Sequence, residues 1–359
     1  MSVAEHQEAW EKLVKQNPAC GFMQSLMWAE FKKSVGWETH HIGVFENDRL
    51  IGGASIMKFH FSPTSNFLYI PQGPVISYED PARAEDIFHG LMSEVDKVVD
   101  LKGKTLTTRP SRGEAKQIMR PGGATTHLRM DPRLLVRPDY FLHLQKSPFN
   151  MEPKHTRMVD LRFSPEEILQ NMKPKGRYNV KIAQKHEVKV VPDHSDSAIG
   201  VFYKLYSQTV TRQEFDGKSE AYFRKLIPAL VAHGMGELYV AHKDGEALAA
   251  AFVIFYGTRA TYFFGASSNR HRTVMAPYLL HFEIMKAAQK HGCHWYDLWG
   301  VAPKEDDASH DWHGITQFKN KFGGERFHFI GAYDFIYNQQ KYAEFLHESG
   351  EVPEAKLPR

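Results

Sequence analysis

The sequence Tyr296-Asp297-Leu298-Trp299-Gly300-Val301 lies near the C-terminal end of the chain, and Gly314-Ile315-Thr316-Gln317-Phe318-Lys319-Asn320-Lys321-Phe322-Gly323-Gly324 follows it after a polar loop. The first stretch is an apolar run that closes on a glycine, as a buried strand does at its end. The second is glycine-rich and carries lysines, which predicts a turn. Because loops beyond strand ends often carry binding residues, the two stretches together predict a binding surface.

The bulk properties favour a globular chain of two domains. It has 359 residues, of which 42% are hydrophobic and 13% aromatic, too many for one ordinary core. A net charge of +3 is too small to predict nucleic-acid binding by itself. The longest strongly apolar run, residues 247–256, is about half of a membrane span.

The cysteines and histidines predict neither a disulfide framework nor a metal site. Cys20 and Cys293 lie far apart in the sequence, and none of the 20 histidines falls in a His-Glu-x-x-His spacing. The first residues lack the basic and apolar blocks of a signal peptide. We therefore expect a cytoplasmic, monomeric protein that uses no metal and no cofactor.

The pattern of helices and strands runs through the chain twice. In the first half we expect two helices, a hairpin, a strand, a helix and further strands: residues 8–35 with a break at 18–21, 37–44 with 49–61, 66–75, 80–101, 104–108 and 140–144. In the second half we expect a strand, a capped helix start and, after residues 187–191, the same order again: residues 158–163, 164–167, 198–210, 220–233, 237–242 with 247–256, 261–266, 277–291 and 295–299. A last helix is expected at 337–347.

This order is that of acetyltransferases of the GNAT type, present twice. We therefore expect an α+β fold of two GNAT-like domains with mixed, mostly antiparallel sheets and an interdomain cleft. The expected domains are residues 1–150, joined by the C-terminal segment 335–359, and residues 151–334.

Eight short segments resemble the Fem family of peptidoglycan-bridge aminoacyltransferases, particularly FemX-like members without the helical arm. They occur in family order over some three hundred residues and are the following: Gln24-Ser25 with Trp28 and Lys32; Tyr69-Ile70-Pro71-Gln72-Gly73-Pro74-Val75; Lys154-His155-Thr156-Arg157; Met172-Lys173-Pro174-Lys175-Gly176-Arg177-Tyr178-Asn179-Val180-Lys181; residues 203–212; Gly265-Ala266-Ser267; Met275-Ala276-Pro277-Tyr278-Leu279-Leu280; and the two opening stretches.

The resemblance implies transfer of an amino acid from aminoacyl-tRNA to the side-chain amine of the stem peptide, on lipid II or UDP-MurNAc-pentapeptide. A lipid-linked acceptor would bring the protein to the inner face of the cytoplasmic membrane. Phe318 and Lys319 match the pair that the family places at the reaction centre. There Lys319 would stabilise an oxyanion, and Phe318 would order the substrate. An ordinary surface lysine beside a core phenylalanine is the alternative.

Further residues match family positions that hold the substrate. Lys32 and Arg212 would bind the diphosphate of the precursor, although a solvated helix lysine is an equal reading of Lys32. Tyr256 matches a substrate-contacting tyrosine, with a core tyrosine as the alternative. The family tyrosine that follows the arginine is missing, because Asp216 stands there, and Tyr222 is its candidate replacement.

A basic cluster suits the acceptor arm of a tRNA, because lysines and arginines that contact phosphates position a nucleic acid. Its members are Lys173, Lys175, Arg177 and Lys181. A solvated helix face is the alternative. The general base is open: the stretch Leu106-Thr107-Thr108-Arg109-Pro110 offers no acid where some family members carry one, and Asp297 and Asp311 are other available acids.

Three other functions are compatible with this fold. An acyl-CoA transferase would need glycines where Arg270-His271-Arg272-Thr273-Val274-Met275-Ala276 stands, because side chains would crowd the pyrophosphate. An aminoacyl-tRNA-dependent transferase with an acceptor outside the cell wall remains open. A protein that binds tRNA or precursor without catalysis is disfavoured by the presence of Lys319 and Phe318.

Overall fold

The computed structural model describes residues 6–62, 65–99 and 125–348. The described residues divide into two compact units, of which the first combines those up to Glu152 with residues 329–348. The second unit runs without interruption from Pro153 to His328. None of the helices in the described ranges has the length and hydrophobicity needed to cross a membrane.

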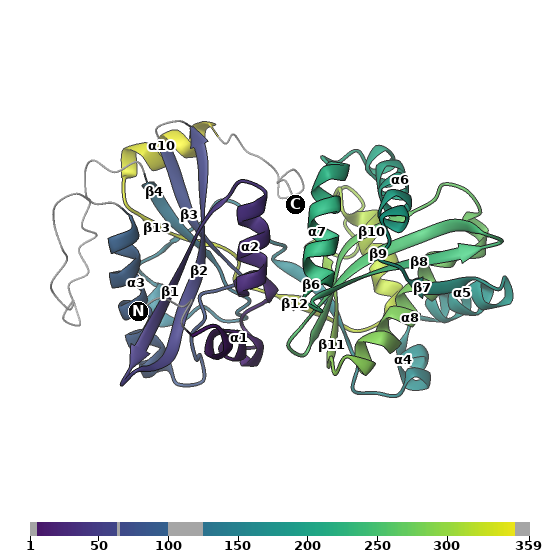
Figure 1. Ribbon diagram of the computed structural model, residues 1–359, viewed down its shortest axis with the longest axis horizontal. Coiled ribbons are helices and arrows are strands. Elements are labelled where there is room, and N and C mark those ends of the chain that lie inside the picture. Colours follow the sequence, from purple (N-terminus) through teal and green to yellow (C-terminus); the bar gives the residue numbers. More distant parts are fainter. Residues whose placement is uncertain (1–5, 63–64, 100–124, 349–359) are drawn as a thin grey trace. The chain divides into compact units, whose positions relative to one another are not determined.

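The first unit is built on a mixed sheet of order β1-β2-β3-β4-β13-β5 (Figure 1). Its elements are α1 (Gln7–Gln16), α2 (Leu26–Ser34), β1 (Glu38–Glu46), β2 (Arg49–Ser62), β3 (Ser65–Pro71), α3 (Pro81–Val98), β4 (Thr125–Asp131), β5 (Gln145–Lys146), β13 (Tyr333–Ile336) and α10 (Gln339–Glu348), with short 3₁₀ helices η2 (Phe22–Gln24) and η3 (Asp139–Phe141). β3 and β4 are parallel, whereas the other pairs in the sheet are antiparallel.

Alternation along β3 divides the core of this unit into two faces. Leu68 and Ile70 pack with the apolar side of α3, whereas Phe67 and Tyr69 point to the opposite face and pack with Phe345 of α10. Figure 1 shows α3 and α2 on opposite sides of the sheet. The C-terminal helix is therefore part of the first unit's core.

A buried ion pair joins two neighbouring strands under α10. Arg129 of β4 donates two hydrogen bonds, of 2.8 and 2.7 Å, to the carboxylate of Asp334 in β13, and both side chains are 0% exposed. Tyr342 of α10 donates a third hydrogen bond of 2.7 Å to the same carboxylate. This pairing holds the pKa of Asp334 below its usual value, although burial alone would raise it.

The second unit is built on a sheet of order β12-β6-β11-β10-β9-β8-β7. Its strands are β6 (His155–Asp160), β7 (Lys189–Pro192), β8 (Gly236–Lys243), β9 (Glu246–Tyr256), β10 (Arg259–Ser267), β11 (Trp295–Gly300) and β12 (Glu325–His328). β10 and β11 are parallel, and the other pairs are antiparallel. The parallel pair thus recurs at the corresponding place in both units.

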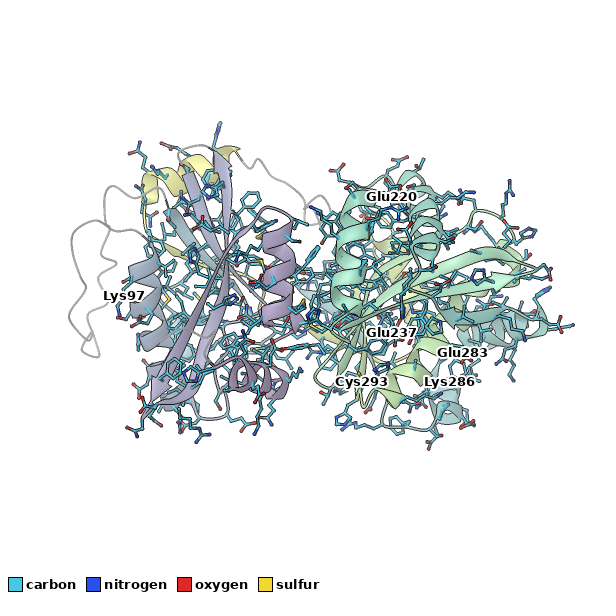
Figure 2. All side chains as sticks on the ribbon, in the orientation of Figure 1. Lys97, Glu220, Glu237, Glu283, Lys286 and Cys293 are labelled. Carbon is cyan, nitrogen blue, oxygen red and sulfur yellow. The ribbon has the colours of Figure 1, made fainter. Side chains whose placement is uncertain are left out.

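Helices cover both faces of this sheet (Figure 1). They are α4 (Pro165–Asn171), α5 (Pro174–Lys185), α6 (Asp196–Gln213), α7 (Glu220–Val231), α8 (Ala276–Lys290) and α9 (His313–Lys319), with 3₁₀ helices η4 (Arg272–Val274) and η5 (Asn320–Phe322). The apolar side of α8 packs on the sheet, and its outer side carries the 2.7 Å ion pair of Glu283 and Lys286 (Figure 2).

Most expected elements are present, and the differences have local causes. The hairpin turn at Asn47 and Asp48 has both residues at positive φ, as a tight turn of this kind requires. The capping box at Ser164 forms with Glu167. The expected strand at residues 140–144 is wrong, because Pro138 caps the 3₁₀ helix η3 there. The expected strand 104–108 lies outside the described residues.

Sequence patterns did not predict five of the strands (β4, β5, β7, β12 and β13) or two of the α-helices (α5 and α9). β4 was missed because only two apolar residues, Leu128 and Met130, alternate with polar ones in it, which is too short a signal. The strands β12 and β13 have only four residues each, too few to give a pattern. The helix α5 was read only as a basic cluster. The lysine-bearing turn predicted at residues 314–324 is instead the helix α9 followed by η5, and only Gly323 and Gly324 take turn conformations with positive φ.

Candidate active site

The strand β11 contains a bulge just before its last residue, Gly300. Opposite β6, Asp297 pairs with Met158 and Gly300 pairs with Thr156, so Leu298 and Trp299 together face one residue. Trp299 takes a φ of 65°, a left-handed conformation that is rare for a bulky side chain. The ladder resumes where Val301 donates to the carbonyl of His155 at 3.0 Å.

Lys319, the last residue of α9, contacts this bulge. Its Nζ donates a 2.6 Å hydrogen bond to the carbonyl oxygen of Gly300, and the residue is only 3% exposed. Nζ also lies 5.8 Å from the ring centre of Tyr262. The side chain predicted on a surface turn is therefore buried, with its ammonium held at the end of a strand.

The helix α9 is fastened to the loop that follows β11. Thr316 accepts a 2.8 Å hydrogen bond from the backbone N–H of Ala302 through its hydroxyl, and Gln317 donates one of 2.7 Å to the carbonyl of Glu305. Gly300 itself packs closely, because a Cβ there would lie 2.9 Å from the ring of Trp312. These contacts fix the position of Lys319 relative to the strand end.

Phe318 packs beside the lysine on the α8 face of the sheet. Its ring meets the rings of Tyr278 and His281 at 5.2 and 5.5 Å. His281 is 1% exposed and lies 2.7 Å through Nδ1 from the hydroxyl of Tyr296. Burial, helped by the positive charge of Lys319, lowers the pKa of His281 to about 3. At neutral pH His281 is neutral, and Lys319 supplies positive charge to this part of the site.

Arg157 holds the turn that follows Lys319. Its guanidinium donates hydrogen bonds of 2.9 Å to the carbonyls of both Gly323 and Gly324, and it pairs with the carboxylate of Glu305. Burial lowers the pKa of Arg157, while the carboxylate beside it opposes this shift. The sequence matched this residue only as part of a motif and gave it no role.

Arg212 lies at the C-terminal end of β10, on the same side of the sheet's strand ends as Gly300 at the end of β11. Its guanidinium, at the C-terminal end of α6, contacts the carbonyl and hydroxyl oxygens of Ser267 at 3.3 and 3.1 Å and the side chain of Asn269. Ser267 ends β10, and β10 runs parallel to β11, so the C-terminal ends of both strands face the same way. Burial, followed by the charge of Arg272, lowers the pKa of Arg212.

The two candidate tyrosines occupy different places. Tyr222, at the start of α7, meets the ring of Phe264 in β10 edge-on at 6.3 Å. Tyr256 is 8% exposed and pairs with Arg259, which lies level with Trp295 at the beginning of β11. At about 3.3 Å per residue, Tyr256 is some 16 Å along the strands from Gly300, so the structure does not bring it to Lys319.

Lys32 belongs to the first unit and is described there by itself. Its ammonium lies 4.0 Å from the ring centre of Trp37 and 5.7 Å from that of Trp28. Such placement over two indole rings is a cation–π arrangement. Lys32 lies in the last turn of α2, where its positive charge also interacts favourably with the helix dipole.

The basic cluster divides into exposed lysines and one structural arginine. Lys173, Lys175 and Lys181 are exposed on and beside α5, and Lys175 lies 4.9 Å from the ring of the exposed Tyr178. Arg177 instead donates to the backbone carbonyls of Gln170 and Met172, which closes the end of α4. Only the lysines and Tyr178 thus present groups that a nucleic acid could contact.

The candidate acids and the two cysteines differ in their exposure to solvent. Asp297 is 0% exposed, whereas Asp311 is exposed. The stretch 106–110 lies outside the described residues. Cys20 and Cys293 are both buried and form no disulfide. Burial raises the pKa of Cys293, which is labelled in Figure 2, to about 11. Within the described ranges, no cluster of three or more His, Cys, Asp or Glu residues could hold a metal ion.

Comparison with known proteins places the chain in a family. The FemAB family matches residues 6–116, 142–242 and 233–346. The chain belongs to the FemAB family. The sequence-based identification as a Fem protein is thereby confirmed. The match spans both units and includes α9 with Lys319.

Two relatives of the FemAB chain have named activities. It is 25% identical over 354 residues to the UDP-N-acetylmuramoylpentapeptide-lysine N(6)-alanyltransferase of Weissella viridescens, covering 94% of this chain and 96% of the relative. It is 22% identical over 395 residues to the lipid II:glycine glycyltransferase of Staphylococcus epidermidis, covering 92% of each. The second alignment has 395 positions and this chain has 359 residues, so the relative has residues that align with gaps in this chain.

The solved structure of FemX has the same fold. It superposes with a TM-score of 0.79 at 19% identity and covers 94% of this chain and 98% of its own. The expected α+β fold of two GNAT-like domains is confirmed. In the described ranges no helix exceeds 18 residues, so the long helical arm of some family members has no counterpart there.

Proposed function

We propose that this FemAB protein transfers an amino acid from aminoacyl-tRNA to the side-chain amine of a peptidoglycan stem peptide. Membership of the family supports this proposal, as do the glycyl- and alanyltransferase activities of the two relatives. The acceptor would be lipid II or UDP-MurNAc-pentapeptide. The observation that carries the proposal is the buried Lys319, whose ammonium is fixed on the carbonyl of Gly300.

The reaction is aminolysis of an ester. The acceptor nitrogen attacks the ester carbonyl carbon and forms an amide bond, while the bond from that carbon to the 3′ or 2′ oxygen of the terminal ribose breaks. The amine proton ends on the released ribose oxygen. Negative charge develops on the carbonyl oxygen in between, and this is the charge that a fixed cation stabilises.

Lys319 suits that role because of its surroundings. It is buried, so a charge beside it is screened less than it would be in water. The hydrogen bond to the carbonyl of Gly300 holds its ammonium in place, and His281 beside it is neutral at pH 7. A preorganised ammonium of this kind needs little rearrangement when an oxyanion forms.

Other residues supply binding in the proposal. Arg212, at the same sheet edge, would hold phosphate oxygens of the precursor in its planar guanidinium. Lys32 is proposed to contribute a second charge from the first unit, and Tyr222 an aromatic contact. Lys173, Lys175 and Lys181, with Tyr178, would follow the acceptor arm of the tRNA.

The decisive experiment offers the purified protein a mixture of charged tRNAs with UDP-MurNAc-pentapeptide or lipid II, and weighs the products by mass spectrometry. We expect a mass increase of one amino-acid residue on the stem peptide. Transfer to neither acceptor, together with transfer of an acetyl group from acetyl-CoA, would refute the proposal. Transfer only to amines from outside the cell wall would support the other aminoacyl-tRNA-dependent function.

The variant Lys319→Met tests the role of the lysine, because methionine keeps a flexible apolar stem without the charge. We expect kcat to fall by ~10²–10³, as when an oxyanion donor is removed. Lys321→Met is the matched control, because this lysine is only two residues away but its Nζ lies 5.9 Å from the ring of Tyr278, whereas that of Lys319 is bonded to the carbonyl of Gly300. Unchanged turnover in Lys319→Met would remove the lysine from the mechanism.

A further inference from the structure

A buried carboxylate stands behind the carbonyl that holds Lys319. Asp297 is 0% exposed, and its Oδ1 accepts a 2.9 Å hydrogen bond from the backbone N–H of Trp299. The hydroxyl of Thr156, on the neighbouring strand β6, donates to the same oxygen. The acid therefore links the bulged residue of β11 to the adjacent strand.

This bond sets the local conformation of the bulge. A side-chain oxygen that accepts from the N–H two residues ahead closes a turn and stabilises the following backbone. Trp299, whose N–H donates this bond, takes the left-handed φ of 65° that a bulky residue otherwise avoids. The carbonyl of Gly300 comes next in the chain, so its direction depends on that conformation.

The carbonyl of Gly300 is in turn the acceptor for Nζ of Lys319 at 2.6 Å. The sequence of contacts runs from Thr156 to Asp297, through the N–H of Trp299 to the carbonyl of Gly300, and then to the ammonium. We propose that Asp297 is a positioning residue that fixes the ammonium of Lys319 by locking the β11 bulge. It does so without touching substrate, and it is not the general base.

This inference deepens the proposed function, since it rests on the role of Lys319 there. The isosteric variant separates geometry from charge. Asp297→Asn keeps a carbonyl oxygen that can accept from Trp299 and Thr156, but it cannot take a proton as a base. Asp297→Ala loses the hydrogen bonds from the hydroxyl of Thr156 and the N–H of Trp299. A positioning role therefore predicts that asparagine rescues what alanine loses.

The first measurement does not depend on activity. Amine acetylation with a limiting reagent, followed by peptide mass spectrometry, reports how firmly Lys319 is held. We expect Asp297→Ala to label about tenfold faster than the wild type at Lys319, because a charged hydrogen bond is weakened. Asp297→Asn should stay within about threefold. The exposed Lys290 serves as the internal reference in each sample.

The second measurement is steady-state transfer. For Asp297→Ala we expect kcat to fall by about ten- to a hundredfold with KM for donor and acceptor nearly unchanged, which is the signature of an interaction made in the transition state. Asp297→Asn should keep kcat within about threefold and leave its pH profile in place. If Asp297→Ala fails to fold, Thr156→Val takes its place and should show a smaller effect of the same kind.

The outcomes separate the two proposals. An asparagine variant as slow as alanine, with wild-type labelling of Lys319, would overturn the positioning role and favour proton transfer by the carboxylate. Wild-type labelling and kcat in Asp297→Ala would also overturn it. Altered labelling in Asp297→Ala combined with full activity of Lys319→Met would keep the positional coupling but refute the role of the lysine in the proposed function.

Discussion

The contact between α5 and the segment after Lys319 depends on a glycine. A Cβ added at Gly176 would lie 2.1 Å from the carbonyl oxygen of Lys321, which is backbone and has little freedom to move. Ordinary C···O contacts fall at about 3.3–3.6 Å, so Gly176→Ala must separate the two segments by roughly 1.2 Å. The same carbonyl accepts a 3.1 Å hydrogen bond from the N–H of Lys173, which this shift weakens.

The magnitude follows from three contributions. Overpacking costs about 1–3 kcal/mol, and a weakened hydrogen bond adds about 0.5–1.5 kcal/mol. Alanine returns up to ~1 kcal/mol because it favours the helix. We therefore expect the second unit to lose about 1–3 kcal/mol, which corresponds to a fall in Tm of roughly 3–10 °C. Because η5 follows Lys319 directly, kcat should also fall about tenfold.

Gly200→Ala in α6 is the matched control. It is also a helix glycine, but the nearest atom to its added Cβ is Nη2 of Arg224 at 3.6 Å. This variant should gain up to ~1 kcal/mol and keep its kcat. Differential scanning calorimetry measures the unfolding transition, and single-turnover transfer measures the chemistry. A Gly176→Ala protein that unfolds no earlier than the wild type and transfers at the wild-type rate would refute the reasoning.

Three further perturbations test other parts of the structure. The folded pKa of His281, about 3, lies below its unfolded value near 6.5, so the stability that this residue contributes is present above pH 6.5 and is lost as pH falls toward 3, by about 1.4 kcal/mol per pH unit. In urea titrations at pH 7 to 4, the free energy of unfolding should therefore depend less on pH in His281→Gln than in the wild type. An equal pH dependence in the two proteins would contradict this. Asp334→Asn should destabilise the first unit by ~3–5 kcal/mol, because it leaves a buried guanidinium uncompensated; an unchanged denaturation midpoint would argue against it. The double variant Lys175→Ala, Lys181→Ala should raise KM for tRNA and lower the slope of log affinity against log salt by about 1–2, whereas Lys290→Ala should do neither; equal salt slopes would remove the helix from tRNA binding.

Sequence patterns gave the order of elements in both units because apolar periodicity and turn residues are local signals. The hairpin at Asn47 and Asp48 and the capping box at Ser164 are examples, since each depends on a few neighbouring residues. The strand β4 left only a weak signal, because Leu128 and Met130 are its only apolar residues and Arg129 between them is a buried polar side chain. The partner of Arg129, Asp334, stands 205 residues away, and a single sequence does not show that pairing.

The candidate site was predictable in its residue types but not in its geometry. The motif pointed to Lys319 and Phe318, yet a surface turn was expected where the structure has a helix and a buried ammonium. Glycines caused this error, since Gly314 lies within α9 rather than in a turn. The role of Asp297 depends on the left-handed conformation of Trp299, which no residue type in the stretch requires.

The position of β13 has a consequence for the order in which the protein is made. This strand lies between β4 and β5 in the first sheet, but it is translated only after the whole of the second unit. At ~5–20 residues per second, that interval lasts roughly 10–35 s on the ribosome. During it Arg129 has no Asp334 to pair with. The N-terminal half of the chain must therefore wait in an unfinished state, and the unit that is synthesised later is the first that can complete its fold.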